Sequence, residues 1–306
     1  MPPSIEAPTE SQEISSSSST MNSSKILHKL QQSNGSTMAM AVRVYLIRHG
    51  ETNWNKKGKI QGGGYDVPLN DNGKAQALKA AKALEGISLD AVASSSLSRA
   101  KETADIVYDY YNSSNSSKKP LRIVNSGFNE MRFGKFEGIK LPHRGDKNMS
   151  PEDEARLDHF FEVKANVWKN HDYCFLARET EEGTNPDDEV YRIDDELSGE
   201  GESINIVTNR SIKALSDTLS RVLAETSSEE PRTKHVAIVS HGRTNKILLG
   251  AMLDEVESQT IQQNNCNISV LDHPGGWETS SVDAGGGWTA RLINSTDHVK
   301  EPTKTS

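Results

Sequence analysis

The order of its predicted elements constrains the fold of this chain more than any other feature. Short runs of β-branched and apolar residues, which favour buried strands, alternate with longer segments of helical composition. The predicted strand from Val42 to Ile47 precedes a helical segment from Asn70 to Gly86, and the strand from Leu89 to Ala93 precedes a helix from Ser96. This alternation predicts an α/β fold with three layers, in which a mostly parallel sheet carries helices on both faces.

The rest of the chain continues this alternation after an interruption. Further helices are predicted at 203–223 and 243–253, and further strands at 235–239, 267–271 and 288–293. Between them, a predicted helix from Pro151 to Lys169 precedes a run from Glu179 to Glu202 in which 11 of the 24 residues are acidic. We interpret residues 141–201 as an insertion that carries a solvated acidic loop. A lid that repels highly anionic substrates is the alternative.

The expected domain covers residues 41–295, and tails flank it. Residues 1–40 contain the run SSSSST and few large apolar side chains, so they cannot bury enough surface to fold alone. We expect a disordered tail there and another at 296–306. An organellar transit peptide is the alternative for the first tail, although Glu6, Glu10 and Glu13 are unusual in such a segment.

Composition limits the partners of the protein. The net charge of -8 argues against a general nucleic-acid binder, which needs a basic face. No apolar run is long enough to predict a membrane span. The two cysteines, Cys174 and Cys266, support neither a zinc site nor a disulfide framework and favour a reducing compartment, the cytoplasm. The sequence leaves the oligomeric state open.

Two predicted strands end on residues that can carry positive charge. Arg48 and His49 follow the first strand, and His241 follows the strand at 235–239. Ligands of open α/β sheets bind at the carboxyl ends of the strands, so both imidazoles are expected against one small ligand. A neutral imidazole is a good nucleophile, and an arginine can bind two phosphate oxygens at once. This pattern predicts phosphoryl transfer through a covalent intermediate, with no need for a metal or cofactor.

Two further residues complete the predicted site. Arg99, early in the helix that follows the second strand, could supply a second guanidinium to the phosphate. Glu130, in FNEMRFGKFEG, is a candidate general acid for the leaving oxygen. Each has a structural alternative, since Arg99 could pair with Glu102, while Glu130 could cap a turn or pair with Arg132.

Six segments occur in the order found in the histidine phosphatase superfamily, which has the phosphoglycerate mutase-like fold. They are LIRHGETNWN, QGGGYDVPLNDNGKAQA, SSSLSRAKETA, NEMRFGKFEG, GES and VSHGRTNKILLG, and the resemblance extends from Val42 to Leu271. It implies that His49 becomes phosphohistidine, that Glu130 donates the proton, and that His241 contacts the transferred group. By the same resemblance, the remaining phosphate-binding residues are Arg48, Asn55, Arg99 and Gly242.

The chain departs from the family pattern in ways that bear on specificity. The loop that begins at Gln61 and Gly62, a possible substrate loop, looks one residue longer than usual, and the insertion is longer than in the smallest family phosphatases. The family's mutases carry an arginine-bearing insert, and residues 140–201 contain no adjacent arginine pair. This favours a phosphomonoesterase acting on a small phosphorylated metabolite. A cofactor-dependent phosphoglycerate mutase is the alternative, followed by a non-catalytic module that binds phosphorylated ligands.

Overall fold

A six-stranded sheet forms the centre of the described part of the protein. The computed structural model describes residues 41–113, 119–141, 150–175, 191–192, 201–226, 232–253, 260–275 and 284–300. The strand order is β4-β3-β6-β1-β7-β8. The strands are β1 (Val42–Arg48), β3 (Ala91–Ser94), β4 (Leu121–Val124), β6 (Lys234–Ser240), β7 (Ile268–His273) and β8 (Thr289–Ser295). Neighbours from β4 to β1 are parallel, whereas β7 is antiparallel to both β1 and β8.

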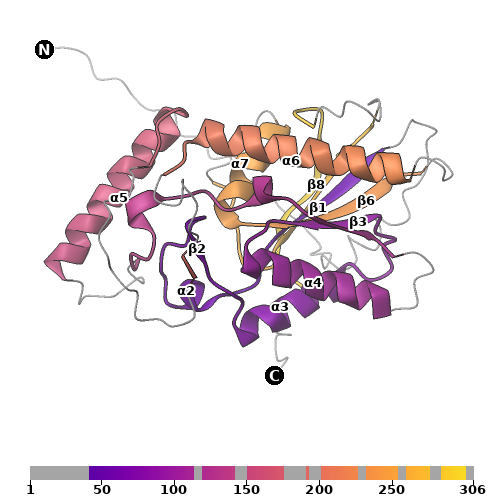
Figure 1. Ribbon diagram of the computed structural model, residues 1–306, viewed down its shortest axis with the longest axis horizontal. Coiled ribbons are helices and arrows are strands. Elements are labelled where there is room, and N and C mark those ends of the chain that lie inside the picture. Colours follow the sequence, from indigo (N-terminus) through magenta and orange to yellow (C-terminus); the bar gives the residue numbers. More distant parts are fainter. Residues whose placement is uncertain are drawn as a thin grey trace, which may run out of the picture.

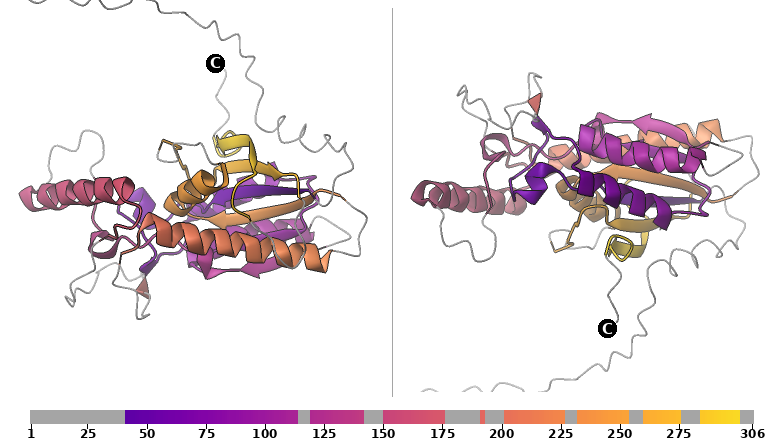
Figure 2. Two further views of the ribbon diagram at one scale, coloured as in Figure 1. Left: turned by 90° about the horizontal axis from the view of Figure 1, so that it is seen from above. Right: turned by 90° about the horizontal axis from the view of Figure 1, so that it is seen from below.

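Helices cover both faces of this sheet, as Figures 1 and 2 show. One layer contains α3 (Asp71–Ala83) and α4 (Ser98–Ser113), and the other contains α6 (Ile204–Glu225) and α7 (Gly242–Leu253). Successive side chains of β1 alternate between them: Val44 and Leu46 pack with residues of α6 and α7, while Tyr45 and Ile47 pack with residues of α3 and α4. The predicted three-layer α/β/α fold is confirmed.

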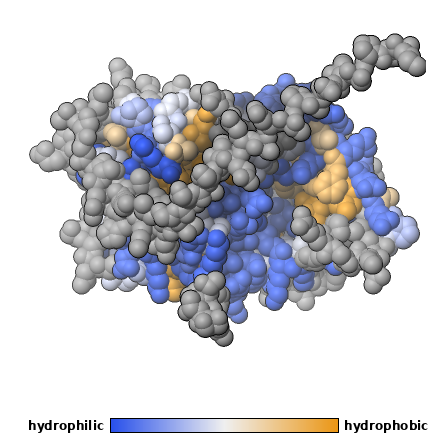
Figure 3. Space-filling view, turned by 180° about the vertical axis from the view of Figure 1, so that it is seen from behind, coloured by the Kyte–Doolittle hydropathy of each residue, from blue (hydrophilic) through white to orange (hydrophobic). Residues whose placement is uncertain are grey.

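The helix predicted in the insertion is present as α5 (Pro151–Lys169) and lies beyond one end of the sheet (Figure 1). Phe160, Val163 and Val167 are buried against residues from η2 (Gly134–Phe136), α6 and α7. The surface seen from behind is largely hydrophilic, and an apolar area lies toward the end that carries α5 (Figure 3). The insertion therefore packs onto the domain through this helix. Most of the acidic run, and with it the suggested lid, lies outside the described residues.

Short elements surround the end of the sheet nearest α5. They are α2 (Asn53–Lys56), β2 (Tyr65–Asp66), η1 (Ser126–Phe128) and β5 (Tyr191–Arg192), of which β2 and β5 form an antiparallel pair. Among the described residues, no helix has the length and apolar character that a membrane crossing requires.

Helix caps and a close backbone approach fix the segment that follows β1. The Asn70 side chain accepts a hydrogen bond from the Gly73 amide at 2.8 Å and caps α3. A Cβ at Gly73 would lie 2.1 Å from the carbonyl oxygen of Glu51. The loop after β1 and the first turn of α3 can approach this closely only because position 73 has no side chain.

The described chain continues past the domain end predicted at residue 295. Residues 297–299 form a turn, and Val299 packs against the cluster shared by β1, α3 and α4. Lys79 of α3 donates a hydrogen bond to the Val299 carbonyl, and His298 contacts the Cys266 carbonyl through Nε2 at 2.8 Å. These contacts tie residues 297–299 to the domain. Residues 1–40 and 301–306 lie outside the described part.

Candidate active site

The two histidines predicted at the strand ends lie side by side. Strands β1 and β6 are parallel neighbours, and their register pairs Arg48 with Ser240. The next residue along each strand is a histidine, so His49 and His241 leave the sheet together, with ring centroids 5.1 Å apart. Both side chains are buried.

The surroundings of His49 select one form of its ring. Its Nδ1 atom lies 2.7 Å from the carbonyl oxygen of Gly50, which can only accept a hydrogen bond, so Nδ1 carries the proton. Burial, followed by the charges of Arg48 and Arg99, holds the pKa of His49 well below its ordinary value. The ring is therefore neutral near pH 7, with an unshared electron pair on Nε2.

His241 is fixed by a chain of hydrogen bonds. Asn129 Oδ1 accepts from the hydroxyl of Ser95 at 2.7 Å, so the Ser95 oxygen in turn accepts from His241 Nε2 at 2.8 Å. This leaves His241 Nδ1 to accept from Arg99 Nε at 3.2 Å. Burial, then the charge of Arg99, lowers the pKa of His241 well below its usual value.

Arg99 lies in the first turn of α4, fully buried beside His241. Besides that contact, it donates from Nη1 to the Tyr65 carbonyl at 3.1 Å and from Nη2 to the Gly62 carbonyl at 3.0 Å. Burial lowers its pKa to about 10, against the opposing effect of nearby carboxylates, so the guanidinium stays charged at neutral pH. The alternative pairing with Glu102 is wrong, since the side chain is directed to the site.

Arg48 brings an unsatisfied donor to the same place. Its Nη1 donates to the Gln263 carbonyl at 2.6 Å, while its buried Nε has no hydrogen-bond partner. A Cβ at Gly242 would lie 3.4 Å from this Nε, so the start of α7 lies against the guanidinium. A buried N–H without a partner is costly, and an anionic ligand oxygen would satisfy it.

The remaining predicted phosphate and loop residues surround the arginines. Asn55 Oδ1 accepts from the Thr52 amide and from Asn265 Nδ2, both at 3.2 Å. With the Gln61 amide nitrogen donating to Thr52 Oγ1, its oxygen accepts from Arg99 Nη1 at 3.1 Å. Gly62 contributes the carbonyl bound by Arg99, so the possible substrate loop reaches the site.

Glu130 is buried at the first turn of α7. Its Oε1 accepts from the amides of Met131 at 2.9 Å and Thr244 at 3.0 Å, and its Oε2 from the Arg243 amide at 3.1 Å. The carboxylate thus caps a helix N-terminus, where negative charge is favoured. The alternative pairing with Arg132 is wrong, because Arg132 Nη2 lies 3.6 Å from Glu202 instead. Of the two structural alternatives, only capping is observed.

Comparison with protein families agrees with this arrangement. The family model of the histidine phosphatase superfamily (branch 1) matches residues 44–165 and 157–282. The chain belongs to the histidine phosphatase superfamily.

Relatives in this superfamily carry both mutase and phosphatase names. A probable phosphoglycerate mutase GpmB from Erwinia tasmaniensis is 27% identical over 262 residues, covering 85% of this chain and 96% of that protein. An uncharacterized phosphatase PhoE from Bacillus subtilis is 39% identical over 102 residues, covering 33% of this chain and 48% of its own. A mycobacterial glucosyl-3-phosphoglycerate phosphatase has a similar fold, with a TM-score of 0.58 and 20% identity over 84% of this chain and all of that one.

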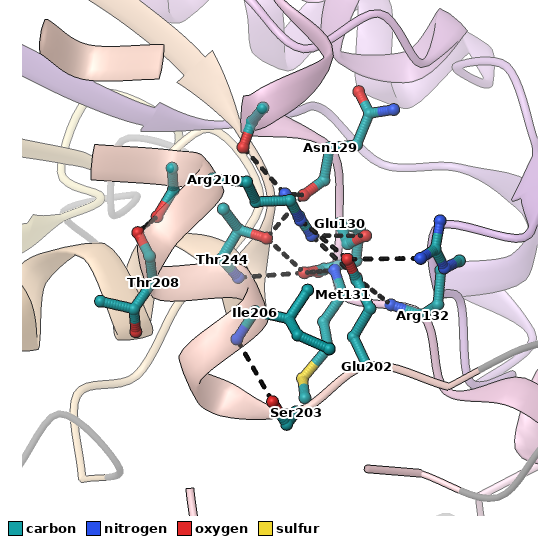
Figure 4. A network of polar contacts seen from close by, with 12 residues as sticks. Asn129, Glu130, Met131, Arg132, Glu202, Ser203, Ile206, Thr208, Arg210 and Thr244 are labelled. Atoms are coloured by element: carbon teal, nitrogen blue, oxygen red, sulfur yellow. Dashed lines mark hydrogen bonds and ion pairs between the residues drawn. The ribbon is translucent and has the colours of Figure 1, made fainter. Parts of the chain in front are cut away.

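Next to the site, an ion pair between the buried Glu202 and the half-buried Arg210 holds the segment that carries Glu130 (Figure 4). Both carboxylate oxygens of Glu202 accept from Arg210, at 2.9 Å each, and one also accepts from the Arg132 amide at 2.9 Å. Arg210 further donates to the carbonyls of Gly127 and Asn129, both at 2.8 Å. Ser203, next to Glu202, caps α6 through a hydrogen bond from the Ile206 amide.

Sequence analysis did not identify several residues of this site. Ser95, Asn129 and Arg210 have no charge run or spacing that marks them, although Ser95 and Asn129 lie in segments that match the family. Glu137, whose carboxylate accepts from the amides of Gly64 and Phe133, follows the candidate acid in NEMRFGKFEG and could have been found there. Within the described residues, no group of three or more His, Cys, Asp and Glu side chains is placed to hold a metal ion.

Proposed function

We propose that this protein is a metal-independent phosphomonoesterase that acts on a small phosphorylated metabolite through a phosphohistidine. The observation that carries the proposal is the hydrogen bond from His49 Nδ1 to the Gly50 carbonyl, which leaves the Nε2 electron pair available. In the first step, Nε2 attacks phosphorus, the P–N bond forms and the bond to the ester oxygen breaks.

Positive charge replaces a metal in stabilising the transferred group. Arg48 and Arg99 would bind the phosphoryl oxygens, the first through its unpartnered Nε. His241, whose Nδ1 borders Arg99, would contact the same group, as would Asn55 and the Gly242 amide. Binding requires Arg99 to exchange one of its present protein contacts for a ligand oxygen.

Glu130 would supply the proton to the departing alkoxide. Its carboxyl group gives that proton up in the first step and, as carboxylate, accepts one from the water that attacks the phosphohistidine. The second step breaks the P–N bond, releases inorganic phosphate and restores both residues. The amides that now cap the carboxylate would hold it in position through both steps.

The test is phosphate release from a panel of phosphate monoesters with a metal chelator present. Wild-type protein should turn over, His49→Ala should lose on the order of 10³-fold or more in rate, and the exposed His171→Ala should match wild type. Acid-labile phosphate on the His49 peptide, found by mass spectrometry after rapid quenching, would identify the intermediate. Full activity in His49→Ala would refute the mechanism.

Phosphoglycerate mutase is the second candidate. The Erwinia tasmaniensis relative, which matches 85% of this chain, is named a probable phosphoglycerate mutase. The same samples of 3-phosphoglycerate should be scored for 2-phosphoglycerate. Isomerisation with little phosphate release would replace the phosphatase by the mutase. Ligand binding without either reaction would favour the non-catalytic module.

A further inference from the structure

Basic side chains gather where α5 meets the start of α7. Arg243 and Lys246 are three residues apart and share one face of α7, while Lys164 and Trp168 are four apart and share one face of α5. The Arg243 guanidinium carbon lies 5.3 Å from the centroid of the Trp168 ring, a cation–π contact that joins the two helices. All four side chains are half-buried.

The charge of Glu130 acts on Arg243 and opposes the lowering of its pKa by burial. Neither Arg243 nor Lys164 forms an ion pair with a described Asp or Glu, and Lys164 stands over the ring of Phe161 at 5.6 Å. Burial, then the charges of Arg243 and Lys164, lowers the pKa of Lys246 to about 8. Half-buried like charges repel one another, so an anion placed among them would be stabilised.

The cluster lies beside the part of the site that holds Glu130. The amide of Arg243 donates to Glu130 Oε2 at 3.1 Å, so the side chain begins beside the proposed proton donor. The charge of Arg48 also reaches Lys246. An ester whose phosphate lies against Arg48 and His49 would extend its alcohol past Glu130 toward Arg243.

We infer that Arg243 and Lys164 form a subsite for a second anionic group, a carboxylate or a phosphate, on the alcohol part of the substrate. The inference rests on the proposed function for the orientation of the ester. Trp168 holds the guanidinium over its ring and so keeps it directed across the junction of α5 and α7. Residues 140–201 contain no adjacent arginine pair. In this cluster the positive charge comes instead from Arg243 on α7 and Lys164 on α5.

The test compares matched esters that differ in the second anion. 3-Phosphoglycerate is set against glycerol 3-phosphate for the carboxylate, and fructose 1,6-bisphosphate against fructose 6-phosphate for the phosphate. Wild type should prefer the ester with the extra anion in kcat/KM. Arg243→Met, which keeps an apolar side chain against Trp168, should reduce that preference by roughly 10- to 100-fold.

Further variants separate charge from packing. Arg243→Lys should retain part of the preference, and Lys164→Met should reduce it less than Arg243→Met does. Arg156→Met, an exposed change on the same α5 helix, should leave the preference unchanged. An undiminished preference in Arg243→Met, with melting showing a folded protein, would overturn the subsite.

Calorimetric binding distinguishes failure of the subsite from failure of the proposed function. If wild type releases no phosphate, the phosphatase proposal fails, and the same ester pairs are titrated into wild type and Arg243→Met. Tighter wild-type binding of the ester with the extra anion, lost in Arg243→Met, would still support the subsite. Equal binding of both members of each pair to wild type would refute it.

Discussion

At the residue scale, the site depends on carbonyls, amides and one ion pair that set the form of each reactive side chain. The Gly50 carbonyl selects the His49 tautomer, and Ser95 does the same for His241 through Asn129. Glu130 depends on such support twice, since α7 amides bind its carboxylate and Arg210 binds the carbonyls before it. A change that spares every reactive group can therefore still displace one of them.

Glu202→Gln tests this dependence. The substitution keeps the shape of the side chain but leaves the Arg210 guanidinium without its buried carboxylate partner, so we expect a loss of about 3 kcal/mol in the free energy of unfolding. The segment that carries Glu130 should also loosen, which would lower kcat for every ester. Urea unfolding and steady-state rates measure the two effects.

The exposed pair of Lys213 and Asp217 on the same helix provides the control. Its atoms lie 2.7 Å apart, but 74% and 53% of the two side chains are exposed, so water screens the pair. Lys213→Met should change neither stability nor rate appreciably. Equal effects of Lys213→Met and Glu202→Gln would contradict the special role given to the buried pair.

At the scale of elements, the position of His49 depends on how the loop after β1 meets α3. Alanine usually favours a helix over glycine by about 1 kcal/mol. Gly73 should show the opposite, because a Cβ there would lie 2.1 Å from the Glu51 carbonyl oxygen. We expect Gly73→Ala to destabilise the protein and to reduce phosphate release by moving the loop that carries His49.

The neighbouring residue supplies a matched control for this prediction. Asn72 occupies the same first turn of α3 and is exposed, so Asn72→Ala should leave stability equal or slightly raised. Thermal melting of both variants, followed by rate measurements, makes the comparison. A stabilised and active Gly73→Ala would show that the loop can move aside freely.

Most elements that sequence analysis predicted have long, regular patterns, and the four-residue β3 is an exception. The α3 segment has both a cap and a helical composition, and β1 and β6 are apolar runs that stop at glycine-containing loops. In contrast, β4, α2 and β2 have only two to four residues, too few to show a period. The antiparallel direction of β7 and the docking of 297–299 depend on tertiary contacts that no local pattern reveals.

Some residues of the candidate site could likewise be predicted from the sequence, and others could not. Arg48, His49 and His241 could be predicted because they follow apolar strands whose ends must meet. The capping role of Glu130 was one of two alternatives that the sequence could not separate, because α7 is remote from it in the chain. Arg210 and the contact between Arg243 and Trp168 depend on how α5, α6 and α7 pack together.

At the scale of the whole molecule, buried neutral histidines make stability depend on pH. His49 and His241 are held uncharged in the folded state, and burial, then the charge of Arg43, lowers the pKa of His235 to about 4. In the unfolded chain these rings titrate near pH 6.5. Below that pH the unfolded state binds more protons than the folded state, so acid favours unfolding.

The free energy of unfolding should therefore fall as pH is lowered from 7.5 toward 4.5. Each histidine contributes a slope of about 1.4 kcal/mol per pH unit, and for His235 this window extends from its unfolded pKa down to about 4. His235→Asn should reduce the slope by the contribution of one histidine, about 1.4 kcal/mol per pH unit. The variant also loses the contact with the Tyr45 hydroxyl, 2.9 Å away, which lowers stability at every pH. His171→Asn, at an exposed position, should leave the slope as in wild type. Urea unfolding at a series of pH values measures these slopes. A slope in His235→Asn equal to that of wild type would mean that the His235 ring is not held neutral in the folded protein.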